Sequence, residues 1–224
     1  MKIKIICILT LLLGVTALKA QTQKQWRDSL SVINSQLYLH PDSTDLLLQK
    51  AAVNLQLLEW EDAAETCNAI LKKDTVNLSA LYFRAYANNN MRRYELARND
   101  YEDFLRMSPR NMQARLGLAY TYIQLKRNAQ AMDEFNNLVE MFPDSSVVYA
   151  ARAELEKEMR SYETALYDYN EALKREPNNQ DYIISKAEVL ISMDRKREAK
   201  ALLDQLVRSG VARGALKDLY AKCK

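Results

Sequence analysis

Apolar residues recur along the chain with the spacing of amphipathic α-helices. Ala63, Cys67, Ile70 and Leu71 fall at i, i+4, i+7 and i+8, which places them on one face of a helix. Another apolar segment precedes them, so the pattern predicts a pair of helices at about 44–58 and 61–74. The stripe returns as Ala97, Tyr101, Phe104 and Leu105, as Ala131, Phe135, Leu138 and Val139, and as Ala165, Tyr169, Ala172 and Leu173.

The helix pairs repeat at a regular interval along the chain. Alanine occupies two places of the period, at Ala51, Ala85, Ala119, Ala153 and Ala187 and at Ala63, Ala97, Ala131, Ala165 and Ala199. A third place holds Pro41, Thr75, Pro109, Pro143 and Pro177, and two positions later come Ser43, Asn77, Asn111, Ser145 and Asn179. Proline stops a helix, Ser or Asn caps the next, and alanine lets paired helices approach closely. The period therefore predicts five copies of one helical hairpin.

These spacings resemble the tetratricopeptide repeat (TPR) family, whose repeat is about 34 residues long. Its motif ends in Ala-x3-Phe followed by Pro, which Ala97-x3-Tyr101 with Pro109 and Ala131-x3-Phe135 with Pro143 match. The first half of the motif departs, because alanine fills the glycine place throughout and the tryptophan place holds Leu47, Leu81, Arg115, Tyr149 and Ile183. The resemblance implies an all-α fold, a right-handed TPR superhelical solenoid of antiparallel helix pairs with a capping helix at each end.

The repeats are expected to form one cooperative domain with a single groove. Trp26, Leu30, Ile33 and Leu37 have helical spacing and predict an N-terminal capping helix within 21–43. Leu216, Leu219 and Tyr220, set among charged residues, predict a C-terminal capping helix within 214–224. The five repeats between the caps are framed at 44–77, 78–111, 112–145, 146–179 and 180–213.

The first twenty residues have the composition of a cleavable signal peptide. Lys2 and Lys4 precede an apolar stretch over 5–15, and Ala20 offers a small residue for cleavage before Gln21. The alternative is that this segment is kept as an N-terminal anchor, although it is short for a membrane span. Cleavage predicts an exported protein of bacterial type, periplasmic if the source is a bacterium, with no transmembrane span in the mature chain.

Removal of this segment changes the charge of the protein. The whole chain has 32 Lys and Arg against 29 Asp and Glu, and the leader contains three of the lysines and no acidic residue. The mature chain is then formally neutral, so the composition gives no reason to expect a nucleic-acid partner. Cys67 and Cys223 remain, and their distant places in the repeats predict that both are free, with Cys67 in the core.

The sequence contains no recognisable catalytic or metal-binding motif. His40 is the single histidine and precedes Pro41 in a turn. Phosphate-binding loops, zinc-binding spacings and nucleophile motifs are absent from the sequence, so we expect neither an enzyme nor a cofactor.

The family resemblance places the ligand groove on the first helix of each repeat. The residues that it assigns to this groove are Tyr82, Tyr86, Asn89, Asn90, Leu116, Tyr120, Ile123, Gln124, Glu154, Lys157 and Glu158. Tyrosine offers contact area and the amides offer hydrogen bonds to an extended peptide, with the strongest binding expected in repeats two and three. The alternative for the tyrosines is that they pack between helices.

We therefore expect an exported, non-catalytic scaffold that binds a protein or peptide segment in its groove as a monomer. Two alternatives stay open at this point. The repeats could stack end to end in an oligomeric structural spacer, or the chain could be an accessory subunit that positions an envelope enzyme.

Overall fold

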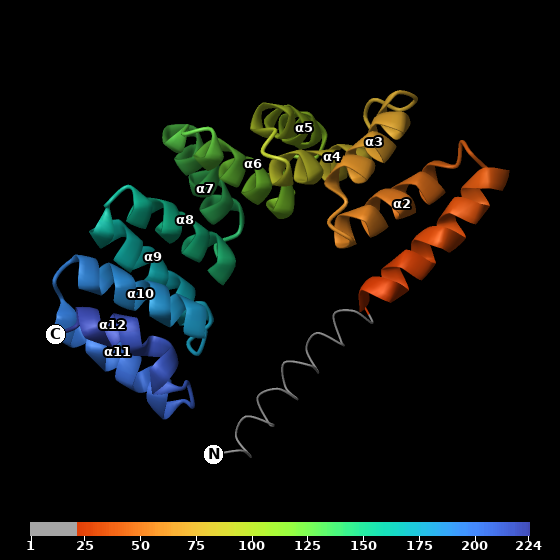
Figure 1. Ribbon diagram of the computed structural model, residues 1–224. Coiled ribbons are helices and arrows are strands. Elements are labelled where there is room, and N and C mark those ends of the chain that lie inside the picture. Colours follow the sequence, from red (N-terminus) through yellow and green to blue (C-terminus); the bar gives the residue numbers. More distant parts are fainter. Residues whose placement is uncertain (1–21) are drawn as a thin grey trace, which may run out of the picture. The chain divides into compact units, whose positions relative to one another are not determined.

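The computed structural model describes residues 22–224, so the predicted signal peptide lies outside the described residues. Every regular element in this part of the chain is helical, which confirms the all-α prediction (Figure 1). Residues 22–39 are helical and precede the labelled elements. The labelled elements are α2 (Thr44–Gln56), α3 (Trp60–Leu71), α4 (Leu78–Asn90), α5 (Tyr94–Met107), α6 (Met112–Gln124), α7 (Asn128–Met141), α8 (Ser146–Glu158), α9 (Tyr162–Arg175), α10 (Gln180–Ser192), α11 (Lys196–Arg208), the 3-10 helix η1 (Arg213–Leu216) and α12 (Lys217–Lys222).

The chain divides into two compact units. Unit 1 is Met1–Pro109, described from residue 22, and unit 2 is Arg110–Lys224. In unit 1, α3 packs against both α2 and α4, and α4 packs against α5. In unit 2, each of the helices from α7 to α10 packs against the helix before it and the helix after it. The expectation of one cooperative domain stays a prediction.

Side-chain caps fix where most of the first helices begin. The side chains of Asn77, Asn111 and Asn179 accept hydrogen bonds from backbone N–H groups three residues later, over 2.9–3.2 Å. Ser43 makes the same contact at 3.4 Å, whereas Ser145 makes no side-chain cap. Each such bond satisfies one of the N–H groups that a helix start leaves without an intrahelical partner. The predicted capping role is confirmed at four of the five places.

Each hairpin turns at a residue with positive φ. These residues are Leu58, Arg92, Lys126, Arg160 and Asp194, with φ between 57° and 62°, and each occupies the same place in its repeat. The N–H group of the following residue donates to the carbonyl oxygen five residues back, as from Glu59 to Asn54 at 2.8 Å. This is the Schellman closure of a helix C-terminus. As a result α2 ends at Gln56 rather than 58. The second helix, α3, also ends earlier than predicted, at Leu71 rather than 74, but without a positive-φ residue.

The alanines of the period are fully buried between the helices. All ten alanines at the two repeated places have an exposed fraction of 0%. Three aromatic residues of the second helices, Tyr101, Phe135 and Tyr169, are exposed by 1% or less. Cys67 is free and fully buried, as predicted, and Cys223 is also free. The repeated apolar stripe therefore forms the core of each unit.

Further helices cover the described ends of the repeat array. Ile33, from the helical residues 22–39, packs with Val53 and Leu57. At the other end, Leu216 of η1 is 3% exposed and packs with Ile183 and Leu206. The sequence predicted a single helix here, but the chain around Gly214 forms a 3-10 turn before α12 begins.

Candidate functional site

The predicted groove residues of unit 1 differ in how much of each side chain is free. The Tyr82 ring lies 6.0 Å from the rings of both Tyr101 and Phe104, so it is partly built into the core, as in the alternative kept for the tyrosines. Tyr86 is 43% exposed. Asn89 is half-buried and hydrogen-bonds to Tyr101, whereas Asn90 is exposed and donates to the backbone oxygen of Tyr86 at 2.9 Å.

Trp60 holds the ring of Tyr86 from the side. Their ring centroids are 5.9 Å apart with an interplanar angle of 72°, an edge-to-face contact. Trp60 begins α3, and Leu55 and Met91 pack near it around the buried alanines of α3 and α4. The sequence analysis did not select Trp60, because the family pattern assigns the groove to first helices and Trp60 belongs to a second helix.

The third repeat, at the start of unit 2, has a similar exposed tyrosine. Tyr120 is 48% exposed, and its ring meets Phe135 edge-on at 6.1 Å and 83°. Burial raises the pKa of its hydroxyl group, so the phenol is neutral at physiological pH. Leu116 and Ile123 are half-buried and Gln124 is exposed. Because Tyr86 and Tyr120 belong to different units, their place in a single groove stays a prediction.

Glu154 and Lys157 are tied into contacts within unit 2. The Glu154 carboxylate accepts hydrogen bonds from Tyr169 and, at 2.8 Å, from Ser185. Lys157 contacts Glu154 at 2.7 Å and Glu188 at 3.1 Å. Burial alone would raise the pKa of Glu154, but the hydrogen bonds from Lys157, Tyr169 and Ser185 outweigh it and lower this pKa. Glu154 is therefore ionised and already paired, while Glu158 is exposed.

Each unit contains a polar pocket. The unit 1 pocket, of about 320 Å³, lies among α3, α4 and α5. The unit 2 pocket, of about 330 Å³, includes Lys157 and Glu188 and is closed on one side by Leu219 and Lys222 of α12. The residues that line the unit 1 pocket are Glu61, Ala64, Asn68, Arg84, Asn88, Arg93, Leu96, Asn99, Asp100 and Asp103.

An arginine clamp joins three helices in unit 1. Arg84 Nε and Nη2 donate to the two carboxylate oxygens of Asp100 at 2.9 and 2.6 Å, and Nη1 donates to Asn68 at 2.7 Å. The Asp100 side chain is only 6% exposed. A planar guanidinium makes such a fork better than an ammonium group can.

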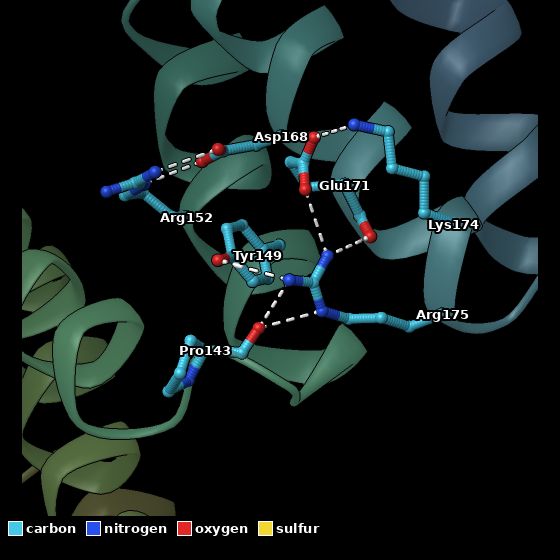
Figure 2. A network of polar contacts seen from close by, with 7 residues as sticks. All are labelled: Pro143, Tyr149, Arg152, Asp168, Glu171, Lys174 and Arg175. Carbon is cyan, nitrogen blue, oxygen red and sulfur yellow. Dashed lines mark hydrogen bonds and ion pairs between the residues drawn. The ribbon is translucent and has the colours of Figure 1, made fainter.

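Unit 2 contains the same clamp two repeats later. Arg152 donates to the two carboxylate oxygens of Asp168 at 2.6 and 2.8 Å (Figure 2). It also donates to Asn136 at 2.9 Å. Neither clamp was predicted from the sequence. Their signal is the equal spacing along the chain from Asn to Arg and from Arg to Asp, but nothing local to one helix indicates that these side chains meet.

Arg175 ties the end of α9 to the loop before α8. Its Nε donates to the carbonyl oxygen of Pro143 at 2.8 Å, and Nη1 donates to Glu171 of the same helix (Figure 2). The guanidinium carbon also lies 4.3 Å from the centre of the Tyr149 ring. Figure 2 shows this network and the Arg152 clamp on neighbouring parts of α8 and α9. These contacts hold α9 against α8 and the loop before it.

The described residues offer no arrangement typical of a metal centre or a membrane span. Across residues 22–224, no three or more His, Cys, Asp or Glu side chains gather as metal ligands would. No helix in the same range combines the length and the apolar character that a bilayer crossing requires. His40 is exposed. Burial raises the pKa of the Cys67 thiol to about 12, so this thiol is not a nucleophile near neutral pH.

Solved structures share this fold at low sequence identity. A tetratricopeptide repeat protein from Parabacteroides merdae superposes with a TM-score of 0.68 at 21% identity, covering 91% of this chain and 79% of that chain. PilF from Pseudomonas aeruginosa has a TM-score of 0.68 at 20% identity, covering 94% and 92%. YrrB, described as a TPR protein with an unusual peptide-binding site, has a TM-score of 0.61 at 15% identity, covering 79% and 91%.

A comparison with family models points to the same fold. A model described as tetratricopeptide repeat matches residues 91–155 and 158–223, together more than half of the chain. No curated protein matches the chain significantly. The helical hairpins, the buried alanines and this match agree, and the chain belongs to the tetratricopeptide repeat family.

Proposed function

We propose that this protein is an exported, non-catalytic scaffold that binds a protein or peptide segment on the first helices of its repeats. TPR proteins are typically scaffolds for protein interactions. The description of YrrB as having a peptide-binding site supports the same class of ligand here. The groove residues predicted from the family resemblance are the proposed contact surface.

The observation that supports this proposal best is the pair of exposed tyrosines at the ninth place of repeats two and three. Tyr86 and Tyr120 keep 43% and 48% of their surface exposed, yet Trp60 and Phe135 fix the orientation of the two rings. An aromatic ring that is held in place before binding loses little conformational entropy when a ligand covers it. The exposed amides Asn90 and Gln124 lie four residues further on, at the thirteenth place.

The charge around Lys157 favours a basic ligand residue. Three carboxylates, those of Glu154, Glu158 and Glu188, lie near Lys157, and Lys222 lines the same pocket as Glu188, which leaves a formal net charge of minus one. A Lys or Arg of the ligand would relieve this excess of negative charge. Because Glu154 and Glu188 are both paired with Lys157, the exposed Glu158 is the proposed contact for this residue. Binding is then expected to weaken modestly as the salt concentration rises.

The test is to capture partners from the native envelope with tagged protein and to identify them by mass spectrometry. The double variant Tyr86→Ala, Tyr120→Ala should lose the partner that the parent captures, since truncation of a central aromatic anchor often costs more than about 1 kcal/mol. Tyr167→Ala is the matched control, because Tyr167 is 60% exposed but lies on α9, a second helix. The proposal is overturned if the double variant folds normally by circular dichroism and keeps every partner.

Export is part of the proposal and rests on the composition of residues 1–20 alone. The intact mass of protein recovered from the envelope tests it. A mass equal to that of a chain beginning at Gln21 supports cleavage. A mass equal to that of the whole chain, residues 1–20 included, supports a retained anchor.

A further inference from the structure

Unit 2 contains a buried carboxyl group without a full set of hydrogen-bond partners. Glu156 of α8 is 8% exposed, and its Oε2 atom has no hydrogen-bond partner. A buried polar atom that is left unpaired destabilises the fold, and an unpaired buried charge destabilises it more. Protonation of Glu156 would remove the charge and turn the carboxyl group into a hydrogen-bond donor.

An acceptor for that proton lies on the neighbouring helix. Asp168 of α9 is 1% exposed and lies within hydrogen-bonding reach of Glu156. Both Asp168 oxygens accept from Arg152, and each keeps a second lone pair for another donor. The charged groups facing Glu156 are Arg152 on its own helix and Asp168 on α9, while α7 contributes the neutral Asn136 through Arg152.

Unit 1 shows the same site with an amide in place of the second carboxyl group. Asn88, two repeats before Glu156, is 4% exposed and hydrogen-bonds to Asp100, the partner of Arg84. An amide N–H donates at any pH, whereas a carboxyl group donates only when it is protonated. One arginine thus faces one carboxylate and an amide in unit 1, but two carboxyl groups in unit 2.

We propose that Glu156 and Asp168 form a proton-binding site beside Arg152. Protonated Glu156 donates to the Asp168 carboxylate, and this hydrogen bond strengthens the α8–α9 hairpin as the pH falls through neutral and below. The proton binds to a Glu156 oxygen from solvent, and no covalent bond other than this O–H bond forms. Unit 1 lacks this response at the matching place, because Asn88 does not titrate. The inference is independent of the proposed peptide binding.

The electrostatics agree with this geometry. Burial raises the pKa of Glu156 from 4.5 to about 7, the charge of Asp168 adds to the increase, and Thr164 and Arg152 oppose it. Between pH 4.5 and about pH 7 the folded chain binds more protons than the unfolded chain. The stability that Glu156 contributes is therefore complete below pH 4.5 and is lost as the pH rises through about 7. From about pH 5.5 to about pH 8.5, this one group would lower the folding equilibrium constant about 30-fold.

The experiment measures thermal and denaturant unfolding of the full chain over this pH range. Glu156→Gln replaces the carboxyl group by an amide of the same shape, and it should remove the 30-fold loss and make the chain more stable than the parent above pH 7. Asn88→Asp is the reciprocal variant and should introduce a loss of stability with rising pH in unit 1. If Glu156→Gln and the parent lose stability equally as the pH rises, the proposal is wrong.

A second measurement needs no substitution. Carbon-13 NMR of the Glu156 carboxyl group in the parent should give a titration midpoint well above 4.5 and near 7. A midpoint at or below about 5 would overturn the proposal even if a variant failed to fold, since the carboxyl group would then be ionised throughout the range.

Discussion

The five hairpin turns allow a sharp test of the structure, because each places an ordinary residue in the left-handed region. Arg92, Lys126 and Arg160 have φ of 60–62°, and all three side chains are exposed. A residue with a Cβ atom loses about 1–2 kcal/mol in this conformation relative to the right-handed one. Glycine avoids this loss but sacrifices about 0.5–1 kcal/mol more backbone entropy on folding. Replacement by glycine should therefore stabilise the protein by about 0.5–1 kcal/mol per turn.

The comparison that isolates the backbone effect is Lys126→Gly against Lys126→Ala. Both variants lose the lysine side chain, but only alanine keeps a Cβ atom at φ 62°. The glycine variant should unfold at a higher temperature, by about 2–4 °C per kcal/mol for a chain of this size. With Arg92→Gly and Arg160→Gly added, the gain should approach about 1.5–3 kcal/mol, because the three turns are separate.

A helix position should show the opposite sign. Asp133 is exposed near the middle of α7, where glycine costs about 1 kcal/mol relative to alanine. Asp133→Gly should thus be less stable than Asp133→Ala in the same unfolding assay. If Lys126→Gly is also less stable than Lys126→Ala, the turn residue is not left-handed and the description of the hairpin turns is wrong.

Two further substitutions test the packing. Asn54 is 1% exposed and neither polar atom of its side-chain amide has a hydrogen-bond partner, whereas the same place four repeats later holds Leu190. Asn54→Leu should therefore raise the free energy of unfolding by about 1–2 kcal/mol in a urea titration. A lower free energy of unfolding would mean that a partner satisfies the amide. Ala131 is 0% exposed, so Ala131→Leu should lower the free energy of unfolding by about 1–3 kcal/mol through overpacking. Gln124→Ala, at an exposed position, is the control. If both variants had the melting temperature of the parent, the helices would not be closely packed at Ala131.

The sequence by itself determined the helical hairpins and their spacing. Apolar periodicity and the N-cap residues act within one or two helical turns, so their effect can be read from neighbouring positions. The two alanine places were also predictable, because five copies of the same small residue indicate one packing requirement. The groove positions followed from the family resemblance, which gives their place in each repeat but not whether each side chain is free.

The tertiary structure decided which polar side chains are available and which are used internally. Glu154 and Glu158 have similar local sequence, yet Tyr169 and Ser185 from two other helices engage Glu154, while Glu158 stays exposed. The raised pKa of Glu156 likewise comes from its burial and from the charge of Asp168, which Arg152 binds on the neighbouring helix. Helical periodicity assigns a residue to a face, but the pairing of two faces, the loss of water between them and the resulting electrostatics depend on residues distant in the chain.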